Sequence, residues 1–161
     1  MRRGWKLGLW ALFAWMSMGV AQAASCQLTT PSFNLGSYNT YDTLSATATG
    51  QMTVACTATT PTEQTTGVVA TVSLSAGSTG NQLDRALVLG MDQLHYNVYL
   101  DPNLTTIFGD GTQGTQNIQT CQDGGSCTAN SLTVPLYAAA PPHQDVGPGA
   151  YQDSLVLNVI F

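Results

Sequence analysis

The chain has 161 residues, of which 43% are hydrophobic and only 8% are charged, and its formal net charge is −5. Three of the four basic residues lie in the first six positions, so the rest of the chain carries one basic side chain, Arg85, against nine acidic ones. This balance excludes a basic patch for nucleic acid or anionic lipid, and the lack of lysine after Lys6 excludes Schiff-base chemistry.

The start of the chain has the pattern of a secretory signal peptide. Basic residues precede an apolar run over residues 7–20, and Ala21-Gln22-Ala23 then supplies the small-x-small pattern that a signal peptidase reads. The run is about 14 residues long, short of the roughly 18 that span a bilayer, so an uncleaved membrane helix is the weaker alternative. We expect removal of residues 1–23, which leaves one domain over residues 24–161 and no membrane anchor.

Four cysteines lie in the expected mature chain: Cys26, Cys56, Cys121 and Cys127. An even number in an exported protein indicates disulfides, and the count alone allows three pairings. Cys121 and Cys127 flank Gln-Asp-Gly-Gly-Ser, a turn sequence that can bring them together, which leaves Cys26 for Cys56. That second bond would close a loop of about 30 residues and contribute roughly 3–4 kcal/mol. A zinc site is the alternative, but paired C-x2–4-C ligands are missing, so we expect no metal.

After residue 24 the sequence shows short alternating runs between turn residues and no sustained helical period. This pattern is typical of an all-β sandwich or barrel, with residues 109–131 as a long loop or hairpin and residues 138–149 as a Pro-rich connection. Pro135 restricts pairing, so its strand is expected at a sheet edge or a bulge. The expected strands are residues 51–58, 67–76, 85–91, 94–100, 105–108, 132–137 and 151–161.

Alternation also assigns faces within these runs. In three of them every second residue is apolar and faces a core. In the run over residues 94–100, His95, Asn97 and Tyr99 point the other way. The expected core residues are Met52, Val54 and Cys56 in the first run, Ala70, Val72 and Leu74 in the second, and Leu94, Tyr96, Val98 and Leu100 in the fourth.

The last run is the most informative strand. Its apolar face continues to the terminal residue without a polar tail. Because a chain end frays unless something holds it, we expect an internal partner for this strand, an external one, or both in turn. The residues on this face are Tyr151, Leu155, Leu157, Val159 and Phe161.

Taken in order, these segments resemble the spore coat protein U domain, which occurs in spore-coat proteins and in archaic (Csu-type) chaperone–usher pilus subunits. The resemblance covers about residues 25–161, and Phe108 stands where the family commonly has tryptophan. The elements that carry it are Cys26, Phe33-Asn34-Leu35-Gly36-Ser37-Tyr38, the run from Gly50 to Cys56, Arg85 ahead of Leu94-His95-Tyr96-Asn97-Val98-Tyr99, Thr106-Ile107-Phe108-Gly109-Asp110-Gly111, Gly149-Ala150-Tyr151-Gln152-Asp153 and the final strand.

The resemblance implies an incomplete immunoglobulin-like β-sandwich that lacks one strand and is completed by a donor strand. The hydrophobic groove would lie beside the C-terminal strand, whose apolar face, described above, would contact the donor. A periplasmic chaperone would fill the groove first, and the N-terminal extension of a sister pilus subunit would replace it at an outer-membrane usher. The protein would then travel through the periplasm to the cell surface.

The function that this implies is a structural subunit of a secreted pilus that supports adhesion and biofilm formation. The alternatives are a spore or cyst coat protein and a non-polymerising adhesin or ligand-binding module. One departure from the family matters: only Ala24 and Ser25 precede Cys26 in the expected mature chain, where a polymerising subunit needs about ten residues or more. We therefore expect a strand acceptor that is a terminal or minor subunit, or a coat protein.

The sequence gives little evidence for a catalytic site. His95 and His143 are the only histidines, no G-x-S-x-G elbow is present, and Glu63 is the only glutamate. The Asp110-Gly111-Thr112 turn lacks the ligand series of a calcium loop. We expect no catalytic residue and no cofactor.

Arg85 stands apart as the sole basic side chain of the expected mature chain. Its predicted role is a structural ion pair across strands, and the candidate partners are Asp84, Asp110 and Asp153. Ligand binding is the alternative.

Overall fold

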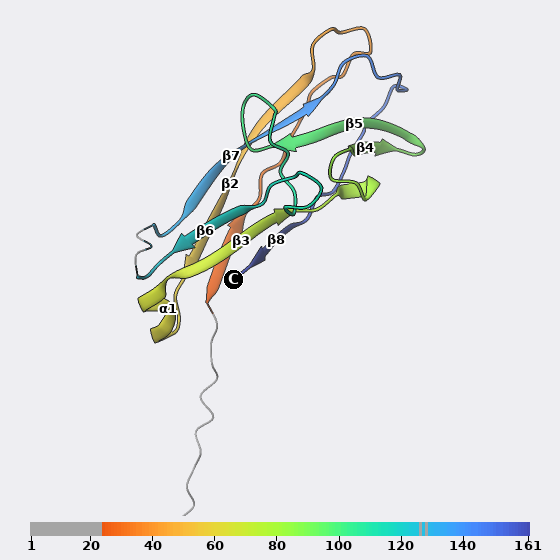
Figure 1. The fold of residues 1–161 in the computed structure, drawn as a ribbon. Coiled ribbons are helices and arrows are strands. Elements are labelled where there is room, and N and C mark those ends of the chain that lie inside the picture. Colours follow the sequence, from red (N-terminus) through yellow and green to blue (C-terminus); the bar gives the residue numbers. More distant parts are fainter. Residues whose placement is uncertain (1–23, 126, 128) are drawn as a thin grey trace, which may run out of the picture.

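Two facing sheets make up the computed structural model, which describes residues 24–125, 127 and 129–161 (Figure 1). The expected signal peptide lies outside these residues. The five-stranded sheet has the order β1-β2-β7-β5-β4, and the three-stranded sheet has the order β6-β3-β8, with every pairing antiparallel. The strands are β1 (Ser25–Thr29), β2 (Ala46–Thr57), β3 (Val68–Leu74), β4 (Arg85–Leu89), β5 (Asp92–Tyr99), β6 (Ile118–Gln122), β7 (Leu132–Ala140) and β8 (Leu157–Ile160).

The core between the sheets is built by the alternation that the sequence shows. Met52, Val54 and Cys56 of β2 are buried, and every second residue between them is more exposed. On β3, Ala70, Val72 and Leu74 are buried in the same way. The predicted inward faces of these two strands are confirmed. Each fully buried valine, leucine or methionine contributes about 1.5–3 kcal/mol, which is what holds the layers together.

The stretch over residues 109–131, expected to be a long loop or hairpin, contains a strand that pairs with another part of the chain. β6 lies within residues 109–131 and pairs with β3. The most deeply buried residue of β6 is polar: Gln122 has no exposed surface. Its side-chain oxygen accepts from Cys56 N at 2.8 Å, and its side-chain nitrogen donates to Val54 O at 3.2 Å. The side-chain amide thereby takes the place of a neighbouring strand along β2. The sequence of β6 shows no alternation of apolar and polar residues, so its pattern does not predict a strand.

The expected strand over residues 105–108 is reduced to isolated bridges. Ile107 bridges Tyr99, and Phe108 bridges Gln116. Phe108 nevertheless lies in the core with no exposed surface, although no regular ladder forms there.

A short helix, α1 (Pro61–Thr66), is also new relative to the prediction. Thr60 and Glu63 form a capping box at its start, and Pro61 occupies the first turn, where its missing N–H costs no hydrogen bond. Six residues are too few to show a helical period, so only the caps mark this helix in the sequence. A 3-10 turn, η1 (Gly77–Thr79), follows β3.

Pro135 lies where β7 has a strand on one side only. β7 pairs with β2 from Ala140 to Leu132, but β5 reaches it only at Tyr137 and beyond. The predicted edge position is therefore correct locally, although β7 as a whole is an inner strand.

Two disulfides tie the fold at separate places. Cys26 is bonded to Cys56 across β1 and β2, and Cys121 is bonded to Cys127 around the turn that follows β6. This is the pairing that the spacing favours. Among the residues described, no helix has the length and hydrophobicity to cross a membrane.

Candidate functional site: an open groove beside the C-terminal strand

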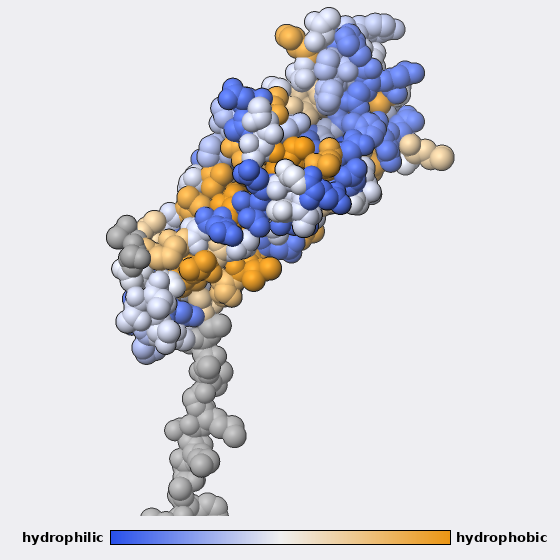
Figure 2. Space-filling model, viewed as in Figure 1, coloured by the Kyte–Doolittle hydropathy of each residue, from blue (hydrophilic) through white to orange (hydrophobic). Residues whose placement is uncertain are grey.

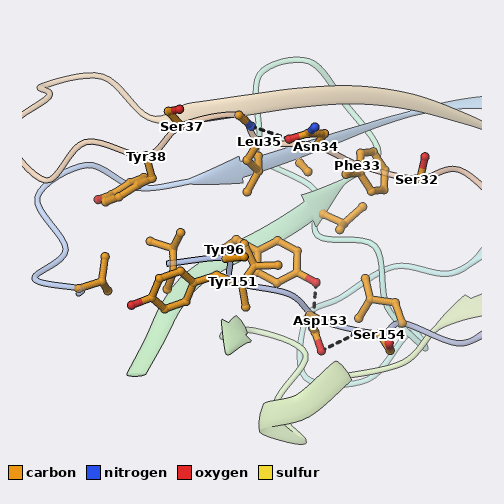
Figure 3. Close-up of a pocket in the computed structure, with 18 of the residues that line it drawn as sticks. Ser32, Phe33, Asn34, Leu35, Ser37, Tyr38, Tyr96, Tyr151, Asp153 and Ser154 are labelled. Carbon is orange, nitrogen blue, oxygen red and sulfur yellow. Dashed lines mark hydrogen bonds between the residues drawn. The ribbon is translucent and has the colours of Figure 1, made fainter. Parts of the chain in front are cut away.

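A groove of about 1040 Å³ with an apolar floor runs between the sheets, with residues 30–40 on one side and the C-terminal segment on the other. Figure 3 shows Phe33, Leu35 and Tyr38 of the first wall opposite Tyr151 of the second, with Tyr96 of β5 beside Tyr151. The floor belongs to the five-stranded sheet. It consists of Leu94, Tyr96 and Val98 of β5 and Leu136 and Ala138 of β7.

The first wall has no strand of its own. After β1 the chain leaves the sheet, and residues 30–38 form no ladder, but Phe33 and Leu35 pack against the core cluster. Tyr38 fixes the far end, since its hydroxyl donates to Pro141 O at 2.7 Å and accepts from Gln144 N at 2.9 Å. The wall is thus held by packing and by one tyrosine, and its backbone is not engaged in a sheet.

The second wall is the C-terminal segment, and it differs from the prediction in two respects. The expected strand over 151–161 is regular only at its end, because β8 pairs with β3 from Leu157 to Ile160. Before that, Gln152 makes an isolated bridge to Val88 of β4. The segment therefore crosses from the edge of one sheet to the other, which a continuous ladder cannot do.

The predicted inward face is only partly as expected. Tyr151, Leu155 and Leu157 line the groove, and Val159 packs against the core cluster. Phe161 does not join them: its side chain is 53% exposed at the end of the chain. The ladder stops at Ile160, so nothing directs the terminal aromatic ring inward.

Asp153 anchors this wall. Its Oδ1 accepts from the backbone N of Ser78 at 3.0 Å and from the Ser78 hydroxyl at 2.6 Å, and its Oδ2 accepts from the Tyr96 hydroxyl at 2.9 Å. Burial raises the pKa of Tyr96, and the bond to Asp153 raises it further, so the phenol remains a proton donor. The carboxylate fixes the segment to η1 and to β5 at the same time.

The outer edge of β8 has no strand beside it in the described part of the chain. The three-stranded sheet ends there, since β8 pairs with β3 alone. An edge of this kind offers N–H and C=O groups to another extended segment. Val69 of β3, Ile160 of β8 and the terminal Phe161 are more than half exposed, and Figure 2 shows exposed apolar surface on this face of the molecule.

Arg85 does not form the predicted ion pair. Its side chain is fully buried, and Nε and Nη2 both donate to Ser75 O, at 2.9 and 2.8 Å. Nη2 also donates to Phe108 O at 2.9 Å, and Nη1 donates to Asn97 Oδ1. Burial lowers the pKa of the guanidinium. The partners are three carbonyl oxygens from three parts of the fold, not a carboxylate.

Asn97 was expected on the outer face of β5, and it is buried instead. Its amide donates to Gln82 O at 3.1 Å and its oxygen receives Arg85 and Val98 N. This end of β5 is enclosed on both faces, so alternation alone could not place the residue.

Both histidines lie at the surface, and His95 points away from the core as predicted. His95 Nδ1 is 2.6 Å from Asp84 Oδ1, with both side chains about half exposed, and His143 is exposed in the loop after β7. Across residues 24–125, 127 and 129–161, no group of three or more His, Cys, Asp or Glu side chains could hold a metal ion.

Comparison with known proteins agrees with this architecture. The family model of the Spore Coat Protein U domain matches residues 12–158. A solved structure, the CsuC–CsuE chaperone–tip adhesion subunit pre-assembly complex from archaic chaperone–usher Csu pili of Acinetobacter baumannii, is similar with a TM-score of 0.57 and 16% identity. The similarity covers 86% of this chain but only 40% of that one. No curated protein matches the chain.

At 16% identity, the solved structure supports the fold: an all-β, immunoglobulin-like sandwich with disulfides, open beside its last strand. The family match extends over most of the sequence. The chain belongs to the spore coat protein U domain family.

Proposed function

We propose that this protein is a structural subunit of a secreted surface pilus, assembled by the chaperone–usher route and completed by a donor strand, and that it supports adhesion and biofilm formation. The observation that carries the proposal is the groove of about 1040 Å³, with its apolar floor, beside the edge of β8 that no described strand pairs with. A strand that entered it would gain ladder bonds from β8 and pockets from the groove floor.

The expected energy of such a strand is large. Each apolar side chain that leaves water for the groove contributes about 1.5–3 kcal/mol, and each new backbone hydrogen bond contributes about 0.5–1.5 kcal/mol. A strand with three to five apolar anchors would therefore rival the stability of a small domain, even after the ordering of the strand is subtracted. Such a strand would be released slowly, as a fibre requires.

The partners in this proposal are a periplasmic chaperone, an outer-membrane usher and sister subunits. The similar solved structure is itself a chaperone–subunit complex, which supports a chaperone as the first occupant of the groove. Export through the periplasm to the cell surface follows from the predicted signal peptide. Residues from Ser25 onward pair with β2, and Cys26 is bonded to Cys56, so a chain cleaved after Ala23 would accept a strand rather than donate one.

Peptide complementation tests the groove directly. The oxidised mature protein would be mixed with a synthetic 12-residue peptide that alternates Val or Ile with Thr or Ser. A second peptide of the same composition, with its apolar residues grouped together, is the control. The alternating peptide should form a stable complex and raise the midpoint of thermal unfolding, whereas the grouped peptide should do neither.

Two neighbouring residues provide matched variants. Leu155 lines the groove, and Val156 points outward and is 56% exposed. Leu155→Ser should weaken peptide binding by about tenfold or more, because a buried contact of about 1.5–3 kcal/mol is lost, while Val156→Ser should leave binding unchanged. Equal effects of the two substitutions, or equal binding of both peptides, would contradict strand addition at this groove.

The adhesive part of the proposal has its own test. Deletion of the gene should remove surface fibres that contain this chain and lower the biomass attached to a surface. Fibres lost with attachment unchanged would refute a role in adhesion and leave the subunit assignment standing.

A further inference from the structure

The backbone nitrogen of Ala24 lies 3.1 Å from Glu63 Oε1, although the two residues are far apart in the sequence. Ala24 is only 9% exposed, and it directly follows the predicted cleavage site. The position where a new N-terminus would appear is therefore held against the domain by a carboxylate.

Glu63 is positioned by bonds to both of its oxygens. Oε2 accepts from the backbone N of Thr59 and of Thr60, each at 2.9 Å, while the backbone N of Glu63 donates to Thr60 Oγ1 at 3.2 Å. The backbone hydrogen bonds from Thr60 and Thr59 lower the pKa of Glu63, so the side chain is ionised at neutral pH. Oε1 is the oxygen turned toward Ala24.

In the part of the chain that the structure describes, no basic side chain pairs with this carboxylate; the ion pair present there joins His95 to Asp84. The nearby carboxylate of Asp123 is used differently, since it accepts from Ala58 N at 2.8 Å. In an uncleaved chain, Glu63 Oε1 would receive the neutral peptide N–H of Ala24. The charge of Glu63 would then lack a countercharge among the residues that the structure describes.

We propose that cleavage after Ala23 supplies this countercharge, and that Glu63 is the docking site for the α-ammonium group of the mature protein. Hydrolysis breaks the Ala23–Ala24 peptide bond and places the oxygen of water on the carbonyl carbon of Ala23, which leaves as a carboxylate. The nitrogen of Ala24 takes up protons and becomes an ammonium group at neutral pH. The inference depends on cleavage and not on strand acceptance, so it can fail while the proposed function stands.

The consequence is a link between maturation and folding. Ala24 lies two residues before Cys26, which is bonded to Cys56 on β2. The ammonium–Glu63 pair would thus connect α1 to the start of β1 only after the signal peptide has been removed. A charge-assisted hydrogen bond is about twice as strong as a neutral one, so the mature chain holds its N-terminus more firmly than the precursor does.

The chain offers an unusually selective probe of this site. Lys6 is the only lysine, so the mature protein has one primary amine, at its N-terminus. The full precursor would be exported, and the purified protein would be examined by N-terminal sequencing, which should give Ala24 first. Its rate of acetylation by an N-hydroxysuccinimide ester would then be measured from pH 6 to pH 10.

The expected rate profile places the pKa of the amine above the ordinary 7.7–8.0, because the carboxylate stabilises the ammonium form. Acetylation at pH 7 should be several-fold slower than in Glu63→Gln, which keeps the capping geometry and removes the charge. Asp123→Asn should leave the profile unchanged. If Glu63→Gln does not fold, the wild-type protein unfolded in urea serves as the reference.

A first residue other than Ala24 would overturn the proposal. So would one acetylation profile shared by the wild-type protein and Glu63→Gln.

Discussion

Replacing Arg85 with methionine should remove a large part of the stability of the domain. The guanidinium makes four hydrogen bonds, to Ser75 O, Phe108 O and Asn97 Oδ1, and the side chain is fully buried. Methionine fills similar space but donates nothing, so these oxygens lose their partner in the interior. Removing one member of a buried charged network costs about 3–5 kcal/mol, against a total stability of about 5–15 kcal/mol for a domain.

Urea unfolding of the oxidised protein measures this loss. A loss of 3–5 kcal/mol corresponds to a midpoint lower by roughly 2 M, since small proteins lose about 1–3 kcal/mol per molar urea. Arg85→Lys keeps the charge but not the planar fork, so it should lose about 2 kcal/mol. Leu87→Met, a volume-conserving change on the same strand, should lose less than about 1.5 kcal/mol.

Two results would refute the reasoning on Arg85. If Arg85→Met unfolds within about 1 kcal/mol of the wild type, the buried network does not stabilise the fold. If it unfolds normally but the cells no longer attach to surfaces, Arg85 serves a ligand rather than the core.

Two further substitutions test contacts that alternation did not predict. Gln122→Leu should lose about 2–4 kcal/mol in urea unfolding, because Cys56 N and Val54 O lose their partner inside the protein; a loss below about 1 kcal/mol would contradict this. Gly124→Ala should lower the thermal midpoint by several degrees, because a methyl group there meets the backbone of α1 and φ is +140°. Gly114→Ala has φ of +88° and open space around it, so it should lower the midpoint less, and equal shifts would contradict the clash.

The sequence predicted those parts of the fold whose burial follows a local period. β2 and β3 bury alternate side chains, β5 does so except at Asn97, and the period of two is visible without knowledge of the neighbours. The disulfide partners also followed from local features, a turn sequence and an even count. The groove position followed from the resemblance and from the apolar C-terminal face.

The parts that were wrong depend on partners distant in the sequence. Arg85 binds carbonyl oxygens that its own strand does not reveal, so carboxylates were the natural expectation. β6 was missed because its buried residue is Gln122, whose hydrogen bonds replace a strand neighbour. Phe161 was placed inward by alternation, yet β3 no longer guides the chain beyond Ile160. In each case the position of the side chain depends on the strand register or on burial by distant segments, and a short stretch of sequence encodes neither.

The C-terminal wall of the groove is held at few points, and this leads to a prediction about Asp153. The regular ladder of β8 has four residues, and the Asp153 bonds to Ser78 and Tyr96 attach the segment that precedes it, together with the Gln152–Val88 bridge and the Val156–Ser75 bonds. Hydrogen bonds to a charged group contribute about 1.5–3 kcal/mol each, and Asp153→Asn keeps the shape while it weakens them.

Hydrogen exchange of the β8 amides should therefore be about 5- to 30-fold faster in Asp153→Asn, which corresponds to about 1–2 kcal/mol of local opening energy. Asp145→Asn, at an exposed position in the loop after β7, is the control and should leave the rates unchanged. The alternating donor peptide should restore slow exchange in Asp153→Asn, because it would pair with β8 from the open side. Fast exchange that persists with the peptide bound would mean that the peptide does not lie along β8, and slow exchange in the free variant would mean that the ladder alone holds this wall.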